Sequence, residues 1–456
     1  MPAAKQYLNP NDNQRLSLLN DEAREIRERQ QAYEKNLKFY LGDQPAQLDT
    51  PTGEPDDNTI INITRMALDR MVSFLFPAVP TFELDTNTTS ETEDERWLRQ
   101  AWDANGGLAF LHKLALNAGL SGHAYVRIRR PSSNQPHQFP QLINLNPTQM
   151  VTYWQADDMD SVLWHTLRWT GHRKEEHLLD TIWFPEQQVW QEHEWMRVPG
   201  TGWRFVALDD WPFPGGPVVE WQHLINPGDF YGLAEGDRKL QEKINLVASE
   251  LARIVRHFAA PKTIATGVAP DDIQETAIGD LWSTENPEAK IANLEMKSDL
   301  KASHELLQFF FDSYLNTVRT VILRGEVKDF QRVTNAGVRT VFLDMLSKNN
   351  LLRFVHGNGL QQISNRMSAI AGRGATIVPE VMHADPLPTD DTERVNVAAL
   401  EHSMNIVSRE TLSTKRGYHW ADELNKMQAE AELEIFQNEQ ETALPEPTDP
   451  SVDSDV

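Results

Sequence analysis

Residues 236–261 read GDRKLQEKINLVASELARIVRHFAAP, and this stretch decides the fold. Its apolar residues alternate spacings of four and three, the repeat of a helix that packs along one seam against other helices. Pro261 ends the pattern because proline lacks the backbone N–H that a helix needs. The stretch therefore predicts a long helix with a seam formed by Leu240, Ile244, Val247, Leu251, Ile254 and Phe258.

A second long helix returns after a short interruption. Residues 303–323, SHELLQFFFDSYLNTVRTVIL, place apolar side chains on one helical face. Between the two helices, residues 262–300 carry β-prone runs at both ends, TIATGV and AKIANLEM. This segment holds eight acidic and three basic residues, which suits a docking surface for basic partners better than a surface for DNA.

The chain before these helices divides into a helical part and a β-prone part. Helical patterns cover residues 16–41, 61–75, 91–104 and 108–120. From Tyr125 to Trp221, short β-prone runs alternate with turn residues, which predicts antiparallel sheets. Nine of the thirteen tryptophans lie between Trp154 and Trp221. We expect them to stabilise thin sheets by burial, with sugar or base stacking as the alternative.

After the second long helix, the pattern predicts one more long helix from Val338 to Ala371, kinked near Gly357 and Gly359. A strand-like run and short capped helices follow. The last twenty residues contain six acids and no base, so we expect a disordered tail.

Composition excludes several classes of protein. The 456 residues carry a formal charge of −24, which argues against a general binder of polyanions. The absence of cysteine removes disulfides, thiolate metal sites and cysteine nucleophiles. The first residues have no apolar core and no apolar run reaches about 18 residues, so we expect neither a secretory signal nor a membrane span.

Motifs for catalysis are incomplete. The run HELLQ resembles a zinc-protease helix, but Gln308 stands where the second histidine is required. His172 and His177 have a spacing that matches neither a helical pair nor a known zinc pattern, and no phosphate-binding glycine loop precedes a lysine. We therefore expect no enzyme activity, no cofactor and no metal.

One short segment is basic within this acidic chain. Residues 323–345, LRGEVKDFQRVTNAGVRTVFLDM, contain Arg324, Lys328, Arg332 and Arg339. Gly325 and Gly337 bracket a hinged loop between two helices. Its bases could contact DNA, or they could be solvated charges or ion pairs between subunits.

The order of these stretches resembles the portal proteins of tailed double-stranded DNA bacteriophages, including prophage and gene-transfer-agent relatives. The resemblance covers most of residues 20–435. Its segments are YEKNLKFYLGDQP, NTIINITRMALDRMVSFLFPAVPTFEL, AGLSGHAYVRI with INLNPTQM, PGDFYGLAEGDRKLQEKINLVASELARIV, VTNAGVRTVFLDML and PLPTDDTERV with IVSRETLSTKRG and DELNKMQAEAE.

The resemblance implies an α+β portal architecture. It has a mainly helical wing with a Trp-rich antiparallel β region, two long stem helices around a small α/β clip, a long kinked wing helix and a short helical crown. The implied divisions are 1–235 wing, 236–261 stem helix 1, 262–300 clip, 301–323 stem helix 2, 324–337 tunnel loop, 338–385 long wing helix and returning strand, 386–436 crown-like helices and 437–456 disordered acidic tail.

The same resemblance implies a function without enzyme activity. A homo-oligomeric ring, usually a dodecamer, would form the DNA channel at one capsid vertex of the virion after assembly in the host cytoplasm. Viral DNA would pass through it during packaging by the large terminase and during ejection. Capsid, scaffolding and head-completion or tail adaptor proteins would be further partners, with no membrane involved.

The resemblance also implies roles for particular residues. Arg324, Lys328, Arg332 and Arg339 would face DNA weakly and without sequence preference, and the seam residues would pack the stem of the oligomer. Docking of terminase at the clip would use Asp271, Asp272, Glu275, Asp280 and Trp282. The alternatives are a head-completion or tail adaptor ring without a translocation role, and a carbohydrate-binding virion protein that uses the Trp-rich sheets.

Overall fold

The fold is α+β, in agreement with the sequence. The computed structural model describes residues 10–50, 52, 56–84, 92–131, 138–155, 158–224, 237–259, 263–266, 288, 290–293, 300–322, 335–373, 380–387, 391–415, 420 and 423–430. Among these residues, no helix is both long and apolar enough to cross a bilayer. The predicted acidic tail, 437–456, lies outside the described residues.

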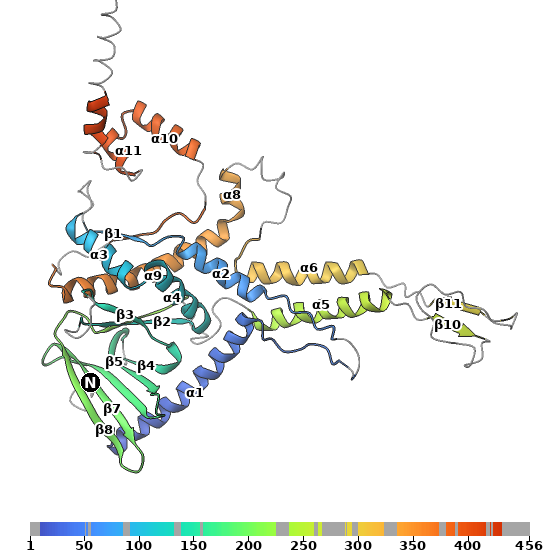
Figure 1. Ribbon diagram of the computed structural model, residues 1–456, viewed down its shortest axis with the longest axis horizontal. Coiled ribbons are helices and arrows are strands. Elements are labelled where there is room, and N and C mark those ends of the chain that lie inside the picture. The colour runs from blue at the N-terminus through green and yellow to red at the C-terminus, as the bar shows by residue number, and fades with distance from the viewer. Residues whose placement is uncertain are drawn as a thin grey trace, which may run out of the picture.

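The N-terminal part of the chain is mainly helical (Figure 1). It contains α1 (Asn13–Leu41), α2 (Ile63–Leu75), strand β1 (Thr81–Glu83), α3 (Glu93–Ala104) and α4 (Gly107–Ser121). Gly42 and Gly122 end α1 and α4 in the left-handed conformation that glycine adopts at low cost. Thr92 and Glu95 form a reciprocal capping box that begins α3. The four helices expected from the sequence are thus present.

The β-prone region forms two antiparallel sheets. The smaller has the order β3-β2-β9, from β2 (His123–Arg129), β3 (Gln141–Asn144) and β9 (Val218–Gln222). The larger is a five-stranded meander, preceded by the short helix η1 (Pro147–Gln149). Its strands are β4 (Met150–Gln155), β5 (Asp158–Thr170), β6 (Glu176–Phe184), β7 (Val189–Val198) and β8 (Gly202–Trp211).

The tryptophans of this region are packing residues. None of the nine indoles between Trp154 and Trp221 is exposed, and Trp195, Trp203 and Trp211 are buried. A stacking platform for sugars would need exposed ring faces. The expectation that these residues stabilise thin sheets by burial is therefore the interpretation that fits the described side chains.

A buried charged cluster joins α1 to the larger sheet. Arg15 donates from Nη1 to Glu22 at 2.5 Å and from Nη2 to Asp180 of β6 at 2.9 Å. All three side chains are nearly inaccessible to solvent. Burial raises the pKa of Glu22, while the Arg15 charge lowers it. Removing one partner from such a cluster leaves buried charge without compensation, so the cluster anchors α1 in one place.

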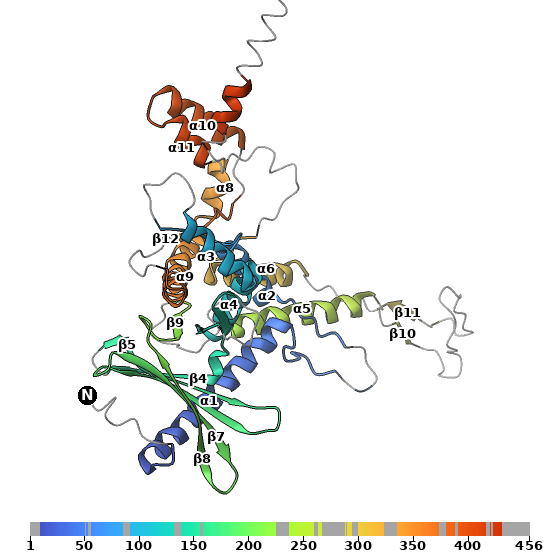
Figure 2. The same cartoon turned by 60° about the vertical axis from the view of Figure 1, so that its left-hand side comes forward.

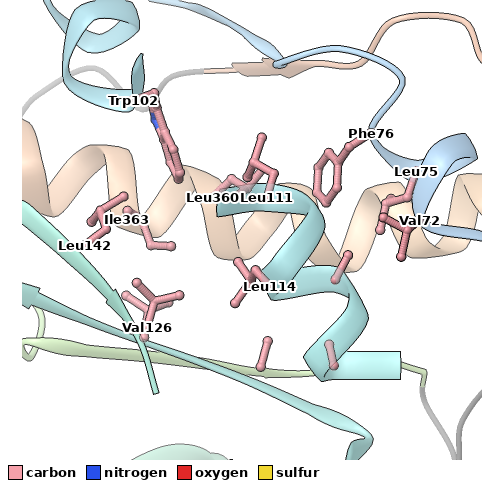
Figure 3. Close-up of a cluster of buried hydrophobic side chains, with 14 of the residues drawn as sticks. Val72, Leu75, Phe76, Trp102, Leu111, Leu114, Val126, Leu142, Leu360 and Ile363 are labelled. Carbon is pink, nitrogen blue, oxygen red and sulfur yellow. The ribbon is translucent and has the colours of Figure 1, made fainter. Parts of the chain in front are cut away.

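The main core lies where α2, α3, α4 and α9 (Leu343–Ile370) meet the smaller sheet (Figure 3). Leu111 and Leu114 of α4 pack here with Leu360 and Ile363 of α9. Burying each such side chain stabilises the fold by about 1.5–3 kcal/mol. Trp102 of α3 is fully buried and donates from Nε1 to Ser364 of α9 at 3.1 Å.

The long helix predicted from Val338 to Ala371 is divided at Phe342, where the sequence predicted no division. Helix α8 (Asn335–Val341) and helix α9 are separated at Phe342, whereas α9 runs without interruption through Gly357 and Gly359. Gly359 instead allows close packing, because a Cβ atom there would lie 2.5 Å from Cε3 of Trp221. The sequence pattern singled out these two glycines but did not predict the close packing of Gly359 against Trp221.

Two buried histidines join α9 to the chain just after β9. Trp221 donates from its indole N–H to Nδ1 of His356 at 3.3 Å, so neutral His356 carries its proton on Nε2. That Nε2–H can donate to Nδ1 of His223, 2.9 Å away. Neither histidine is accessible to solvent. Burial and the nearby His223 and His383 hold the pKa of His356 well below its usual value.

A helical hairpin projects from this body (Figures 1 and 2). It consists of α5 (Arg238–Ala259) and α6 (Leu300–Thr317), which lie side by side. Beyond their far ends, β10 (Thr263–Thr266) pairs antiparallel with β11 (Lys290–Asn293). Both strands fall in the runs expected to be β. Helix α6 ends at Thr317, whereas the sequence predicted that it would extend to Leu323.

The remaining described elements follow α9. Strand β12 (Glu380–Met382) pairs with β1, and α10 (Asp391–Ser403) and α11 (Arg409–Lys415) are the short helices expected near the C-terminus. Exposed apolar side chains are frequent on α10 and just after it, among them Leu400, Met404 and Ile406.

Candidate functional site

The root of the α5–α6 hairpin is the best-defined candidate site, because three elements meet there. Ile244 of α5 is fully buried against Tyr314 and Leu315 of α6 and Ile63 of α2. Leu240 packs against the edge of this cluster, and Val247 is also buried. Near the root, the predicted seam is therefore covered within the chain by α6 and α2.

The outer part of the seam is less enclosed. Leu251 and Ile254 are half-buried, and Phe258 lies in the last turn of α5, where side chains are outside the described residues. The side chains that are buried deepest therefore lie at the root, where they fix the direction in which the hairpin leaves the body.

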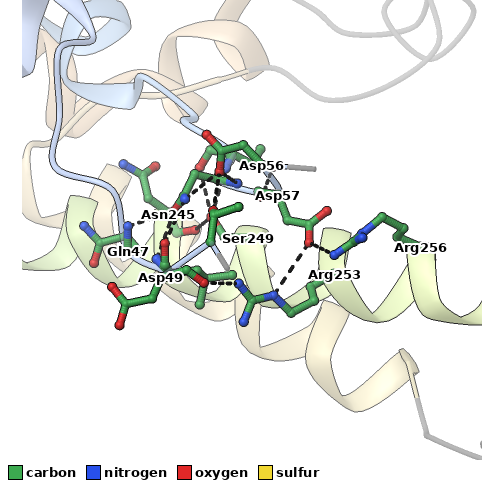
Figure 4. Close-up of polar contacts among 12 residues, drawn as sticks. Gln47, Asp49, Asp56, Asp57, Asn245, Ser249, Arg253 and Arg256 are labelled. Carbon is green, nitrogen blue, oxygen red and sulfur yellow. Dashed lines mark hydrogen bonds and ion pairs between the residues drawn. The ribbon is translucent and has the colours of Figure 1, made fainter. Parts of the chain in front are cut away.

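A second face of α5 is polar and buried, and the sequence analysis missed it. Gln241, Asn245 and Ser249 recur every four residues and are at most 1% exposed. They bind the backbone of the chain between α1 and α2, where residues 44–50, 52 and 56–62 are described and which we call the strap (Figure 4). The available signal was the recurrence of polar residues at every fourth position of a helix that also has an apolar seam.

Side chains on this face of α5 bind the backbone of the strap, as a neighbouring β-strand would do in a sheet. Asn245 Oδ1 accepts from the backbone N–H of Ile61 at 3.0 Å, and its Nδ2 donates to Gln44 at 2.6 Å. Ser249 Oγ accepts from the N–H of Thr59 at 2.9 Å. Gln241 accepts from the N–H of Ile63, just after the strap, at 3.1 Å. Buried backbone groups need such partners, so the strap depends on α5 for its conformation.

Charged groups extend these contacts toward the far end of α5. Arg256 Nη2 donates to the carboxylate of Asp57 at 2.6 Å, and Arg253 lies 3.6 Å from the same carboxylate. Arg253 also donates to the carbonyl of Asp49 at 2.9 Å. Asp57 is 8% exposed. Beside it, hydrogen bonds from the backbone and side chain of Asn58 lower the pKa of Asp56.

The chain leaves α6 through a turn that two cations hold. Arg319 adopts a left-handed conformation with φ of 51°, and Thr320 N–H donates to Leu315 O at 2.9 Å in a helix-terminating pattern. Lys348 of α9 donates to Val318 O at 2.8 Å, and Arg70 of α2 donates to Val321 O. Cations favour the carbonyl end of a helix, so this turn is fixed to the body.

The predicted DNA-facing residues are only partly described. Arg324, Lys328 and Arg332 lie outside the described residues. Arg339 lies in α8 and forms an ion pair with Asp385. Partial burial raises the pKa of Asp385, but hydrogen bonds from Arg339 and Leu387 N–H outweigh it and lower that pKa. Arg339 thus has a partner within the chain.

The predicted docking residues cannot be placed in the fold. Asp271, Asp272, Glu275, Asp280 and Trp282 all lie outside the described residues. What the structure describes of this region is the β10–β11 pair that flanks them. The acidic segment is therefore bracketed by two paired strands.

The incomplete metal motifs are separated in the structure. His304 and Gln308 are exposed on α6, whereas His177 stacks on Trp169 in the larger sheet at a ring distance of 4.9 Å. Among the residues that the structure describes, no three or more His, Asp or Glu side chains form a group able to hold a metal.

Comparisons with known proteins give distant structural likenesses. No family model and no curated protein sequence matches this chain. A chain from the virion of a native gene transfer agent particle is similar at 12% identity, with a TM-score of 0.40, over 84% of this chain and 99% of that one. A chain from the neck of an empty gene transfer agent particle is similar at 13% identity, with a TM-score of 0.40, over 78% of this chain and 88% of that one.

Proposed function

We propose that this protein is a portal, a ring-shaped head-to-tail connector through which viral double-stranded DNA is packaged and later ejected. The observation that carries the proposal is the α5–α6 hairpin with the β10–β11 pair beyond its far end (Figures 1 and 2). In this proposal the hairpin is the stem, the segment between the helices is the clip, and residues 324–337 form the tunnel loop.

The anchoring of the hairpin supports this role. A channel wall has to keep its direction while a polymer moves past it. The root is held by an apolar cluster on one side of α5 and by the strap on another. The turn after α6 is bound to α2 and α9. Such a root would transmit force from the wall to the body without bending.

The charge of the chain supports a conduit. DNA carries one negative charge per about 1.7 Å of axis, so a strongly basic wall around a ring would trap it. A protein with a formal charge of −24 and a few bases in one loop would contact DNA only briefly. In this proposal a separate large terminase supplies the energy, and the protein itself hydrolyses no ATP.

Electron microscopy of the purified protein tests the proposal. We expect a closed ring, of twelve subunits in the usual portal form, with a central hole wide enough for a DNA duplex and a narrower collar formed by the hairpins. A head-completion or tail adaptor would give a ring without a stem and a clip. Particles that remain monomeric, or ATP hydrolysis by the purified protein alone, would contradict the proposal.

A further inference from the structure

Helix α6 is apolar on two sides. Its inner side, with Tyr314 and Leu315, is buried against α5 and α2. On the other side, Leu306 is 45% exposed and Phe309 is 63% exposed. At 100° per residue, these two residues point away from the buried side, and Glu305 and Asp312 are exposed on the same outer face. Leu306 and Phe309 thus form an apolar pair among charged side chains on the exposed side of α6, and such a pair is a candidate surface for a partner.

Helix α5 also has a face that the described residues leave uncovered. The seam packs inward, and the face with Gln241, Asn245 and Ser249 binds the strap. The remaining sector, which we call the outer face of α5, has half-buried Leu246 at its centre and three exposed residues around it, Lys239, Lys243 and Glu250. Its half nearest the root carries exposed Lys239 and Lys243 and half-buried Glu242.

The outer faces of α5 and α6 lie at similar positions along the length of the hairpin. Because α5 and α6 are antiparallel and Ile244 packs beside Tyr314 and Leu315, Lys243 and Asp312 lie within about one helical turn of the same level. Leu246 and Phe309 lie within a similar offset. In a closed ring whose axis runs along the hairpins, groups at similar height on neighbouring copies can meet.

We propose that the outer face of α5 in one copy packs against the outer face of α6 in the next copy, with Lys243 paired to Asp312 and Phe309 covered by Leu246. The proposal rests on the ring proposed above. It replaces the expectation that the buried seam residues Ile244 and Val247 join the copies, since these are already covered within the chain near the root.

A second copy fits this surface better when it presents α5 than when it presents α6. Two α6 outer faces related by a two-fold axis near Phe309 would place Glu305 of each copy beside Asp312 of the other. Repulsion between these neighbouring carboxylates would oppose association of the two copies. A contact between two different faces avoids this repulsion, and such contacts are the kind that generate rings.

A charge swap tests the pairing. Lys243→Glu and Asp312→Lys, each made alone, should weaken ring assembly at least about tenfold, because the repulsion recurs at every interface. The double variant Lys243→Glu/Asp312→Lys should recover assembly, since the pair is restored with reversed sign. Native mass spectrometry and sedimentation over a concentration series give the assembly constants. Arg173→Glu, an exposed charge reversal in the turn between β5 and β6, is the matched control and should assemble as wild type.

A variant of the apolar centre gives an independent readout. Phe309→Ser should impair assembly while the thermal midpoint of the dissociated chain stays within a few degrees of wild type, because Phe309 is largely exposed in one copy. Normal rings from Phe309→Ser, or from both single charge variants, would overturn the inferred interface. They would not contradict the proposal that the protein forms a ring. Absence of rings in wild type would contradict the proposed function itself.

Discussion

Asp57 of the strap accepts a 2.6 Å hydrogen bond from Arg256 of α5, across 199 positions of sequence. The strap thereby contacts α5 at two levels, at Gln44 near the root and at Asp57 farther along the helix. We expect Asn245→Leu to lower the free energy of unfolding by about 2–4 kcal/mol, because Ile61 N–H and Gln44 lose their partner in a buried place. Urea unfolding measures the loss. Glu34→Leu, an exposed change on α1, should shift stability by less than about 0.5 kcal/mol. Equal effects of the two substitutions would mean that the strap is not held by α5.

The close approach of Gly359 to Trp221 leads to a second prediction. Gly359→Ala should destabilise the protein by about 1–3 kcal/mol, because its Cβ would overlap the indole ring. Gly357→Ala is the matched control two residues away, where the nearest atom, Nε2 of His383, would be at 3.6 Å. Gly357→Ala should be neutral or should stabilise α9 by up to about 1 kcal/mol through helix propensity. Thermal unfolding of both variants measures the two changes in stability. A loss of stability from Gly357→Ala as large as that from Gly359→Ala would contradict the role given to the close contact between Gly359 and Trp221.

The buried histidines make stability depend on pH. Unfolded histidines bind a proton near pH 6.5. In the folded chain, the pKa of His356 lies well below that value, and burial with the nearby Arg353 lowers the pKa of His383 to about 4. As pH falls, the unfolded state therefore binds more protons than the folded state. The stability contributed by these residues is present above about pH 7 and is lost toward pH 4, at up to about 1.4 kcal/mol per pH unit for each histidine.

The variant His356→Gln isolates this effect. Its free energy of unfolding should fall less steeply than that of wild type between pH 7 and pH 5, even if its stability at pH 7 is lower. Urea titrations at half-unit pH steps give the two slopes. His172→Gln, at an exposed turn position, should keep the wild-type slope. Parallel profiles for wild type and His356→Gln would show that His356 is not the group that titrates on unfolding.

The basic loop gives a prediction tied to the proposed function. Lys328→Ala combined with Arg332→Ala should leave ring assembly intact and reduce DNA packaging or DNA retention, because transient phosphate contacts are lost. Arg339→Ala is the control, since Arg339 already pairs with Asp385. That variant should package normally and lose no more than about 1 kcal/mol of stability. Normal packaging by the double variant would identify Lys328 and Arg332 as solvated charges.

Much of the secondary structure could be predicted because its signals are local. Pro261 lies just past the end of α5, Gly42 and Gly122 end their helices, and the runs around Ile264 and Ile291 became paired strands. The end of α6 was misjudged, because Val318, Val321 and Ile322 continue the apolar pattern although the chain has left the helix, and this segment contacts α2 and α9. The break at Phe342 had no glycine or proline to mark it.

The candidate site was predicted only in part, and the reason lies in the seam of α5. By itself, the sequence determined that α5 has an apolar stripe that must be covered, because helical periodicity is a property of neighbouring residues. It could not determine what covers Ile244, since α6, α2 and another copy would all satisfy the same pattern. Only the tertiary structure decided this, by placing Tyr314 and Ile63 against Ile244 and the strap against Asn245. The burial of one face by distant parts of the chain leaves Lys243, Leu306 and Phe309 as the surface for a partner.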